Sequence, residues 1–366
     1  MKNYNLALIG LGNVNRALAE IIHRDGDKLA AELGFALRVT AITDLRYGSL
    51  VDADGIDLGP VLAMGPDDTF AGLGGTPRRR DESLLPASPT TEALGAASTP
   101  RIDMEQFIRT APADIVVEAT FTNPTDGEPA LSHVRWALDS GKSVCTTNKG
   151  PAAFAVEELK ALAASRGVRF EFEGAVMSGT PVLRLASGPL KGVGITGFSG
   201  ILNGTSNYIL TRMEAGLSQR DAIAEAKQHG YAEADPTADI GGSDVRLKVA
   251  VLANELLGVR IAPDAIETEG ITGITPDMVA EATSQGAHWK LIGRASKAGD
   301  GTATASVSPQ MVDANHPLAT ISGATNAVMF DTEYLGRLTL SGPGAGRVET
   351  AYALLSDIIA IDAATS

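Results

Sequence analysis

A glycine-rich turn, GLGNVN at residues 10–15, constrains the fold of this chain more than any other feature. The short aliphatic run YNLALIG leads into it, and apolar residues recur at helical spacing through residues 16–33. LRVTAIT, at residues 37–43, has the composition of a second strand. A strand, a glycine turn, a helix and another strand predict the opening of a parallel α/β unit.

The same pattern continues further along the chain. ADIVVEAT (113–120) and KSVCTTN (142–148) are near-continuous apolar runs, as expected for strands that are buried on both faces. From residue 151 onward helical patterns mix with strand candidates such as HWKLIGRAS, TATASVSPQMV and RLTLSG, which predicts a second domain of the α+β class.

The glycine turn has most of the features of a dinucleotide site. Gly10 permits the tight turn, and Gly12 lets the backbone approach a pyrophosphate where Asn13 and Val14 begin the helix. Asn15 stands where the third glycine of the pattern belongs, so helix and strand must pack around a side chain. The predicted fold class is α/β, a Rossmann-type dinucleotide-binding domain plus an α+β domain.

Two residues after the second strand bear on the choice of dinucleotide. Asp44 closes the strand, where an acid accepts hydrogen bonds from the ribose 2′-hydroxyl of NAD. Arg46 instead suits the 2′-phosphate of NADP. The sequence leaves both cofactors open.

Composition narrows the class of protein. The 366 residues exceed one ordinary domain, and 44 acidic against 30 basic residues give a formal charge of −14, which disfavours nucleic acid and anionic membranes as partners. The single cysteine, Cys145, excludes an internal disulfide and fits a reducing cytoplasm. No basic leader and no apolar run long enough to span a bilayer is present, so we expect a cytoplasmic protein.

Residues 59–100 are rich in proline, glycine, serine and threonine and predict a long, partly mobile excursion from the first domain. They include the basic run Arg78 to Arg80. Such a run is either a solvated loop face, which we favour, or a phosphate clamp.

The stretch GYAEADPTADIGGSDVRLK, at residues 230–248, places four acids ahead of one lysine: Glu233, Asp235, Asp239 and Asp244 before Lys248. Pro236 disfavours helical geometry at Asp235 and predicts a loop that can turn its acids inward. Asp244 and Lys248 share one face of a helix, where such a pair is ordinarily a surface ion pair of about 0.3 to 0.5 kcal/mol. Asp239 by itself is equally an exposed loop carboxylate, and Asp235 has no assigned role.

Four longer stretches carry a family resemblance: TTNKGP (146–151), GILNGTSNYIL (200–210), NHPLATISGATNAVMF (315–330) and LSGPGAGRVETA (340–351). With the glycine turn, they make the chain resemble the homoserine dehydrogenase family over nearly its whole length. That family interconverts L-homoserine and L-aspartate 4-semialdehyde with NAD or NADP, in threonine and methionine biosynthesis. The resemblance implies a homodimer that acts on a small amino-acid substrate.

The family's fold implies a division of the chain. Residues 1–150, completed by 336–366, would form the dinucleotide-binding domain, and residues 151–335 the catalytic and dimerisation domain. Some members carry a C-terminal regulatory domain that senses threonine. This chain ends soon after its last glycine turn, so we expect it to lack that domain.

The resemblance also assigns roles in catalysis. Lys248 resembles the catalytic lysine, Asp244 its partner carboxylate, and Lys149 a second active-site lysine that shares or owns the proton transfer. Taken alone, Lys149 would be a solvent-exposed loop residue. The sequence does not assign the proton to one lysine.

Homoserine carries an ammonium and a carboxylate, so its pocket needs hydrogen-bond acceptors for one and donors for the other. Glu233 resembles the family's substrate-binding glutamate, and Asp239 a second acid near the same group. Thr205 either donates its hydroxyl to the substrate or caps the helix that follows it.

Two further groups of residues are implied by position in the motifs. The first borders the cofactor: Thr120, Asn148, Gly344 and Gly346. The second, in EGAVMSGTP (173–181), resembles a loop that holds a monovalent cation, commonly sodium, through the oxygens of Glu173, Val176, Ser178 and Thr180. The alternative for both groups is a glycine-containing turn that serves chain geometry alone.

Two other functions compete with this assignment. One is a related NAD(P) dehydrogenase that acts on another small amino alcohol or aldehyde. The other is a non-catalytic nucleotide-binding sensor, which would be expected to lose Lys149, Asp244 or Lys248; all three are present.

Overall fold

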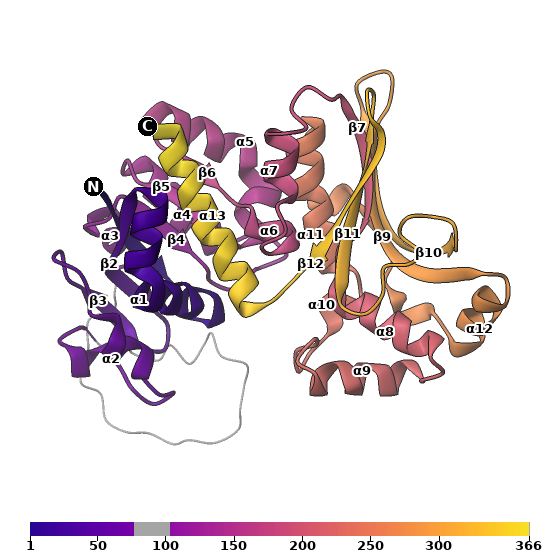
Figure 1. Cartoon of the computed structure of the whole chain (residues 1–366), viewed down its shortest axis with the longest axis horizontal. Helices are drawn as coiled ribbons and strands as arrows, with labels where there is room; N and C mark the ends of the chain where they lie inside the picture. The colour runs from indigo at the N-terminus through magenta and orange to yellow at the C-terminus, as the bar shows by residue number, and fades with distance from the viewer. Residues whose placement is uncertain (77–102, 366) are drawn as a thin grey trace.

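The computed structural model describes residues 1–76 and 103–365; the run Arg78 to Arg80 lies outside them. Its first sheet has six strands in the order β3-β2-β1-β4-β5-β6 (Figure 1). They are β1 (Lys2–Ile9), β2 (Phe35–Asp44), β3 (Gly48–Val51), β4 (Ile115–Glu118), β5 (Ser143–Thr146) and β6 (Phe170–Glu171). All neighbours are parallel except β2 and β3, which are antiparallel.

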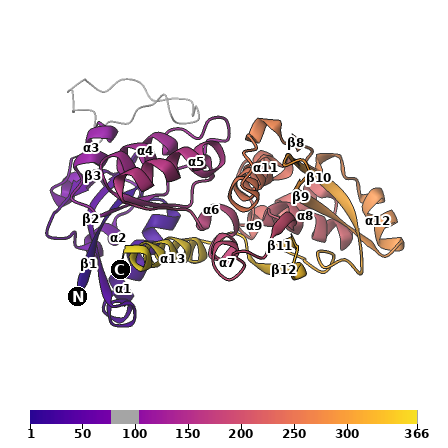
Figure 2. The same cartoon turned by 90° about the horizontal axis from the view of Figure 1, so that it is seen from above.

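Helices cover both faces of this sheet. On one face lie α1 (Asn13–Leu33) and α13 (Arg347–Thr365), and on the other α3 (Met104–Thr110), α4 (Ala130–Asp139) and α5 (Lys149–Arg166), as Figure 2 shows. The strands alternate between the two faces: Leu8 packs with α1 and α13, whereas Ile9 packs in the core beneath α4 and α5. The fold class expected from the apolar runs is confirmed.

The sheet has a topological switch point between β1 and β4, where the chain order reverses. Ligands of doubly wound α/β folds bind at such a point, outside the carboxyl ends of the strands. Here those ends are Ile9 in β1 and Glu118 in β4. The first part of the 59–100 excursion forms two short helices, α2 (Leu58–Ala63) and η1 (Phe70–Leu73).

The second sheet is mixed, in the order β12-β11-β7-β9-β10-β8. Its strands are β7 (Ile195–Ile201), β8 (Glu267–Thr268), β9 (Ala287–Lys297), β10 (Ala303–Asp313), β11 (Thr325–Thr332) and β12 (Gly336–Pro343). Helices pack on one face: α8 (Gly204–Glu214), α11 (Ser243–Leu252) and α12 (Pro276–Ser284). Close packing explains Gly293 of β9, where a Cβ atom would lie 2.6 Å from a Val249 side-chain atom of α11.

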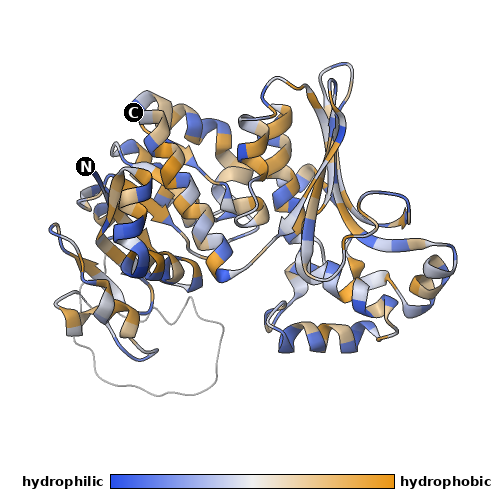
Figure 3. Ribbon diagram, viewed as in Figure 1, coloured by the Kyte–Doolittle hydropathy of each residue, from blue (hydrophilic) through white to orange (hydrophobic). Residues whose placement is uncertain are grey.

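Other helices complete this half: α9 (Gln219–Gln228), α10 (Thr237–Ile240), the π-helical turn η3 (Ala253–Leu257), and the single turns η4 (Pro263–Ala265) and η5 (Ile271–Gly273). Figure 3 shows that α9 is largely hydrophilic, whereas the first sheet and its helices are rich in hydrophobic residues. None of the helices in the described ranges is long and apolar enough to cross a membrane.

One continuous hydrophobic core joins the two halves through α5, α6 (Gly174–Met177), α7 (Val182–Ser187) and α11. The C-terminal segment 336–366 divides between them: β12 pairs with β11 in the second sheet, and α13 returns to pack against α1 (Figure 1). The helix that crosses residue 150, α5, begins at the carboxyl end of β5.

Candidate active site

Three charged side chains meet where α5 of the first half approaches α11 of the second. Lys149 is the first residue of α5, because Asn148 caps that helix by accepting a hydrogen bond from Gly150 N at 3.0 Å. Lys149 Nζ lies 3.3 Å from Asp244 Oδ1. The sequence placed Lys149 in a loop after a strand; the helix cap now fixes it.

Asp244 and Lys248 occupy successive turns of α11 on one face, as their spacing predicts. Lys248 Nζ lies 2.8 Å from Asp244 Oδ2 and donates a hydrogen bond to Leu202 O at 2.7 Å. The lysine side chain is only 7% exposed. The pair is therefore not the surface ion pair that the spacing alone would favour. The residue before the helix is Gly242, whose φ of 84° suits glycine.

Burial and charge shift the three ionisation equilibria in different directions. Burial lowers the pKa of Lys248 below its ordinary value, and the neighbouring Asp244 only partly reverses this. Burial by itself would raise the pKa of Asp244, but Lys248 and Lys149 outweigh it and hold that pKa far below the usual range. Asp244 is thus a fixed anion between two lysines.

Asn203 connects this group to a second acid. Its Nδ2 donates to Asp244 Oδ2 at 3.0 Å and to Asp239 Oδ1 at 2.7 Å, and its Oδ1 accepts from Ser206 N as the cap of α8. Burial, followed by the charge of Asp244, raises the pKa of Asp239. Sequence reasoning missed Asn203, although an asparagine directly before a helical GTSNY stretch is a capping signal.

The remaining substrate candidates lie around Asp239. Thr205 does not cap α8, because Asn203 does; its hydroxyl donates to Tyr231 O at 2.5 Å instead. The capping alternative for Thr205 was therefore wrong. Glu233 lies on an exposed stretch, and no contact brings it to the other acids among the residues described.

Asp235 gains a structural role. Its Oδ1 accepts from Thr237 N at 3.0 Å and from the Thr237 hydroxyl, so it holds the first residue of the one-turn helix α10 in place. Pro236 does keep Asp235 out of the helix, but the segment after it is helical rather than the expected loop, and Asp239 lies within that turn. A proline is compatible with the first turn of a helix because it needs no amide partner there.

The glycine turn lies at the switch point of the first sheet. Gly10 has a φ of 81°, and a Cβ atom there would lie 3.0 Å from Ala119 O, so both conformation and space require glycine. Gly12 precedes α1, and a Cβ on it would meet no heavy atom of the described chain within 4 Å. No described side chain caps α1, which leaves the amides of its first turn, from Asn13 and Val14 onward, for an anion.

Asn15 shows how the chain manages without the third glycine. The side chain is buried, and its Nδ2 donates to Gly10 O at 2.7 Å, to Ile9 O at 3.2 Å and to Val117 O at 3.3 Å. It thus ties the carboxyl ends of β1 and β4 together beneath the turn, so the departure from the pattern is compensated.

Asp44 supports the same turn. Its Oδ2 accepts from Leu11 N at 2.8 Å, and its Oδ1 accepts from Arg46 N at 2.7 Å. The guanidinium of Arg46 lies 5.8 Å from the centre of the Tyr47 ring. The Asp44 carboxylate therefore links the backbone of the glycine turn to the backbone at Arg46.

Two of the cofactor candidates lie beside the glycine turn, on the strand ends next to it. Thr120 follows β4 with its Cγ2 3.3 Å from the Cβ position of Gly10, and Asn148 follows β5 and donates to Thr120 O at 3.3 Å. Gly344 lies after β12, where a Cβ would clash with the buried side chain of Asn326, and Gly346 has a φ of 137°. Chain geometry requires glycine at both positions.

The expected cation loop forms a tight bend after β6. Both carboxylate oxygens of Glu173 accept hydrogen bonds from the first turn of α7, from Leu183 N and Arg184 N, and burial raises the pKa of Glu173. Ser178 has a φ of 53°, and its hydroxyl lies 2.8 Å from the hydroxyl of Thr350. Thr180 donates to Pro343 O, and Val176 is buried in α6.

A dinucleotide turn at the switch point of one half, together with a lysine–carboxylate pair where the two halves meet, is the arrangement of a nicotinamide-dependent oxidoreductase. Residues 181–359 match the model of the homoserine dehydrogenase family. The NAD(+)-dependent homoserine dehydrogenase of Pseudomonas canavaninivorans is 50% identical over 361 residues, which cover 99% of this chain and 97% of that protein. The homoserine dehydrogenase of Methanocaldococcus jannaschii is 35% identical, over 98% of each chain.

Solved structures agree with this relationship. A putative homoserine dehydrogenase from Archaeoglobus fulgidus superposes with a TM-score of 0.80 at 33% identity, covering 98% of this chain and 99% of that one. A hyperthermophilic archaeal homoserine dehydrogenase in complex with NADPH has a TM-score of 0.76 at 28% identity, covering 99% and 98%. This chain belongs to the homoserine dehydrogenase family. The family resemblance inferred from its motifs is confirmed, and with it the assignment to NAD(P)-dependent oxidoreductases.

Proposed function

We propose that this protein interconverts L-homoserine and L-aspartate 4-semialdehyde with Lys248, Lys149 and Asp244 as its catalytic residues. The observation that supports this assignment is the position of Asp244: its Oδ1 contacts Lys149 Nζ and its Oδ2 contacts Lys248 Nζ. Lys149 comes from the dinucleotide-binding half and Asp244 from the other half, so the three side chains lie where the two halves meet. In the oxidation the hydride leaves the carbon of the alcohol group and the proton leaves its oxygen, so both must be positioned at one place.

The glycine turn fits the cofactor, since open space faces Gly12 and free amides begin α1. A nicotinamide cofactor held there would supply the hydride chemistry at C4 of homoserine. The protein supplies the proton chemistry: a neutral Lys248 Nζ takes the hydroxyl proton during oxidation and returns it as an ammonium during reduction. Its lowered pKa makes the neutral form easier to reach, and Asp244 holds the amine in place.

Lys149 is proposed to orient the reacting oxygen. It is the more exposed lysine, with 22% of its side chain accessible, and its contact with Asp244 is longer. Its remaining donors are therefore free to turn toward a substrate oxygen. The assignment of proton transfer to Lys248 rests on deeper burial and is the part of the mechanism that pH profiles test.

Asp239 and Glu233 are proposed to bind the substrate ammonium, and Thr205 to line the same place. Asp239 supports this best, because it is half-buried and its carboxylate lies within the Asn203 network. A substrate ammonium beside it would offset the burial and repulsion that raise its pKa. Glu233 is presented on the exposed stretch before α10.

We propose NAD rather than NADP as the preferred cofactor. The carboxylate of Asp44 lies at the end of β2, held by Leu11 N and Arg46 N, where it can accept from a ribose hydroxyl but would repel a 2′-phosphate. The NAD(+)-dependent Pseudomonas relative is consistent with this choice. Thr120, Asn148, Gly344 and Gly346 remain proposed as neighbours of the cofactor.

A monovalent cation is proposed in the bend formed by Glu173, Val176, Ser178 and Thr180. Backbone and carboxylate oxygens are the ligands that a hard cation prefers. We further propose a homodimer, together with the division into a dinucleotide-binding domain (1–150 and 336–366) and a catalytic domain (151–335). The β12 strand, which pairs in the second sheet, argues for a later start of the returning segment.

The function is tested by following nicotinamide absorbance with homoserine and a panel of other small amino alcohols, using NAD and NADP in parallel, with and without sodium or potassium. We expect homoserine with NAD to give the highest kcat/KM. Lys248→Ala should lower kcat by about a hundredfold or more, while NAD affinity stays near that of the wild type.

Lys160→Ala is the matched control, because Lys160 lies in α5 beyond the kink at Ala155, away from Lys149, and pairs with Glu255. It should leave kcat unchanged. Near-normal turnover of Lys248→Ala would refute the catalytic assignment, and a preference for another alcohol would favour the related-dehydrogenase alternative.

A further inference from the structure

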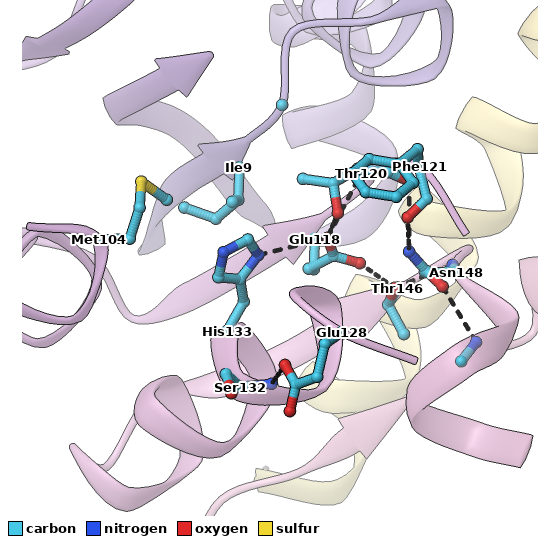
Figure 4. Close-up of polar contacts among 12 residues, drawn as sticks. Ile9, Met104, Glu118, Thr120, Phe121, Glu128, Ser132, His133, Thr146 and Asn148 are labelled. Atoms are coloured by element: carbon cyan, nitrogen blue, oxygen red, sulfur yellow. Dashed lines mark hydrogen bonds and ion pairs between the residues drawn. The ribbon is translucent and has the colours of Figure 1, made fainter. Parts of the chain in front are cut away.

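Glu118 is a buried carboxylate that the reaction scheme does not use. It is the last residue of β4, is fully buried, and lies at the carboxyl edge of the first sheet. Burying a charged group is costly unless hydrogen bonds replace its water. Figure 4 shows what replaces it: Thr120 N donates at 3.0 Å, the Thr120 hydroxyl donates, and the Thr146 hydroxyl donates at 2.9 Å.

These hydrogen bonds join two neighbouring strand ends. Glu118 and Thr146 are register partners across β4 and β5. The Thr146 hydroxyl has one proton, which it gives to Glu118, and its oxygen accepts from Asn148 N at 3.0 Å. The carboxylate therefore fixes the orientation of that hydroxyl and, through it, the backbone at Asn148.

Asn148 closes the network on its other side. Its Nδ2 donates to Phe121 O at 2.9 Å and to Thr120 O at 3.3 Å, and its Oδ1 caps α5 at Gly150 N (Figure 4). One buried carboxylate thus links the loop after β4 to the first turn of α5. The next residue in the chain is Lys149, and the loop carries Phe121, which is 59% exposed.

The imidazole of His133 also faces Glu118, at the distance of an ion pair that requires a protonated ring (Figure 4). His133 Nδ1 lies 3.7 Å from Glu118 Oε1, beyond hydrogen-bond distance, and has no hydrogen-bond partner in the described part of the chain. All three hydrogen bonds to Glu118 come from the end of β5 and from the loop after β4. Glu118 therefore braces two neighbouring strand ends.

We propose that Glu118, acting through Thr146 and Asn148, is a positioning residue that sets Lys149 and the cofactor-facing loop at Thr120 relative to each other. The inference rests on the proposed roles of Lys149 and Thr120. Lys149 reaches Asp244 across the junction of the two halves at 3.3 Å, so a shift of the first turn of α5 moves it out of reach of the reacting oxygen.

Thr146→Val tests the proposal, because valine keeps the shape of threonine but removes the hydroxyl between Glu118 and Asn148. We expect kcat for homoserine oxidation to fall by about tenfold to a hundredfold, because a displacement of about 1 Å can cost that much. NAD affinity should change by less than about threefold, since the pyrophosphate amides of α1 are untouched. Thr146→Ser, which restores the hydroxyl, should recover most of kcat.

Ser143→Ala is the matched control at the other end of β5. It also deletes a buried hydroxyl, the acceptor of Arg169 N at 3.2 Å, but far from the strand ends that face the cofactor. It should lower thermal stability to a similar degree and leave kcat unchanged. Glu118→Gln, measured alongside, should lower kcat in the same direction, because a single amide oxygen replaces two carboxylate acceptors.

Two outcomes would overturn the proposal. One is a normal kcat in Thr146→Val. The other is a loss of kcat that follows the loss of stability equally in Thr146→Val, Thr146→Ser and Ser143→Ala. Either outcome leaves the proposed function standing, provided that the wild-type protein oxidises homoserine. A wild-type protein inactive on homoserine would instead refute the function itself.

Discussion

Asp244 is the residue on which the site depends, because it serves two lysines at once. A single carboxylate charge faces two ammonium groups, at 2.8 Å and 3.3 Å, so its ionised form is strongly favoured. Lys248 is in the opposite situation: burial favours its neutral form and lowers its pKa. Asp244 thus stays an anion, and Lys248 is an amine suited to the proposed proton transfer.

The ionised carboxylate of Asp239 should lower the stability of the fold while it improves substrate binding. Burial and the nearby Asp244 raise its pKa, so the folded state disfavours its ionised form. Its ionisation therefore costs stability above the folded-state pKa, and this cost disappears as pH falls below the unfolded-state pKa. Asp239→Asn should raise Tm at pH 7 by about 2 °C, and the gain should vanish in acid.

The same substitution removes an anion from the proposed ammonium site. KM for homoserine should rise by about tenfold, the usual scale for losing one charge-assisted hydrogen bond. Thermal melts across pH and steady-state kinetics measure the two effects. A variant Asp239→Asn that is more stable but has an unchanged KM for homoserine would contradict the proposed role of Asp239 in substrate binding.

Among the elements, α1 is expected to bind the cofactor pyrophosphate, and its first residues allow a sharp comparison. Gly12→Ala places a methyl group in open space at a φ of −77°, which any residue adopts. We expect the fold to stay as stable as the wild type while NAD binds about tenfold more weakly, because the methyl group occupies the approach of the pyrophosphate. Titration of intrinsic fluorescence with NAD measures the affinity.

Gly10→Ala provides the contrast. At a φ of 81° and 3.0 Å from Ala119 O, the added Cβ should lower Tm as well as NAD binding. Equal NAD affinity in Gly12→Ala and the wild type would argue against pyrophosphate binding at this turn.

Elements with local signals were predictable from the sequence. The strand, glycine turn and helix at the amino terminus, and the four-residue spacing of Asp244 and Lys248, depend on nearby residues and periodicity. Asn203 was not found from the sequence, because its hydrogen bonds to Asp239 and Asp244 join residues that are 36 and 41 positions apart in the chain. The brace at Glu118 was missed for the same reason: its link to Thr146 exists only once β4 and β5 lie side by side. Strands β7 and β11 were not named in advance, since β7 contains two glycines and the apolar run of β11, AVMF, is only four residues long.

At the scale of the whole molecule, the second sheet is covered by helices on one face only. On the opposite face Ser199 of β7 lies between Met329 of β11 and Arg294 of β9. The residues 314–324 cover part of this face, and a hollow of about 1180 Å³ lined by these three side chains remains. Such a face is suited to a second copy of itself. Asp331 and Arg337 also line it and pair with each other, with Arg337 Nε 2.9 Å from Asp331 Oδ1.

Ser199→Arg should therefore separate the proposed homodimer. The substitution places a long cation at the centre of the open face, beside Arg294, where two copies would bring four positive charges together. We expect the wild type to show about twice the 37.8 kDa chain mass in light scattering after gel filtration, and Ser199→Arg to show one chain mass. Ser284→Arg, on the exposed end of α12, is the control and should remain a dimer. A dimer that survives Ser199→Arg with unchanged mass would move the interface away from this sheet, because a desolvated like-charge contact at its centre would not be tolerated.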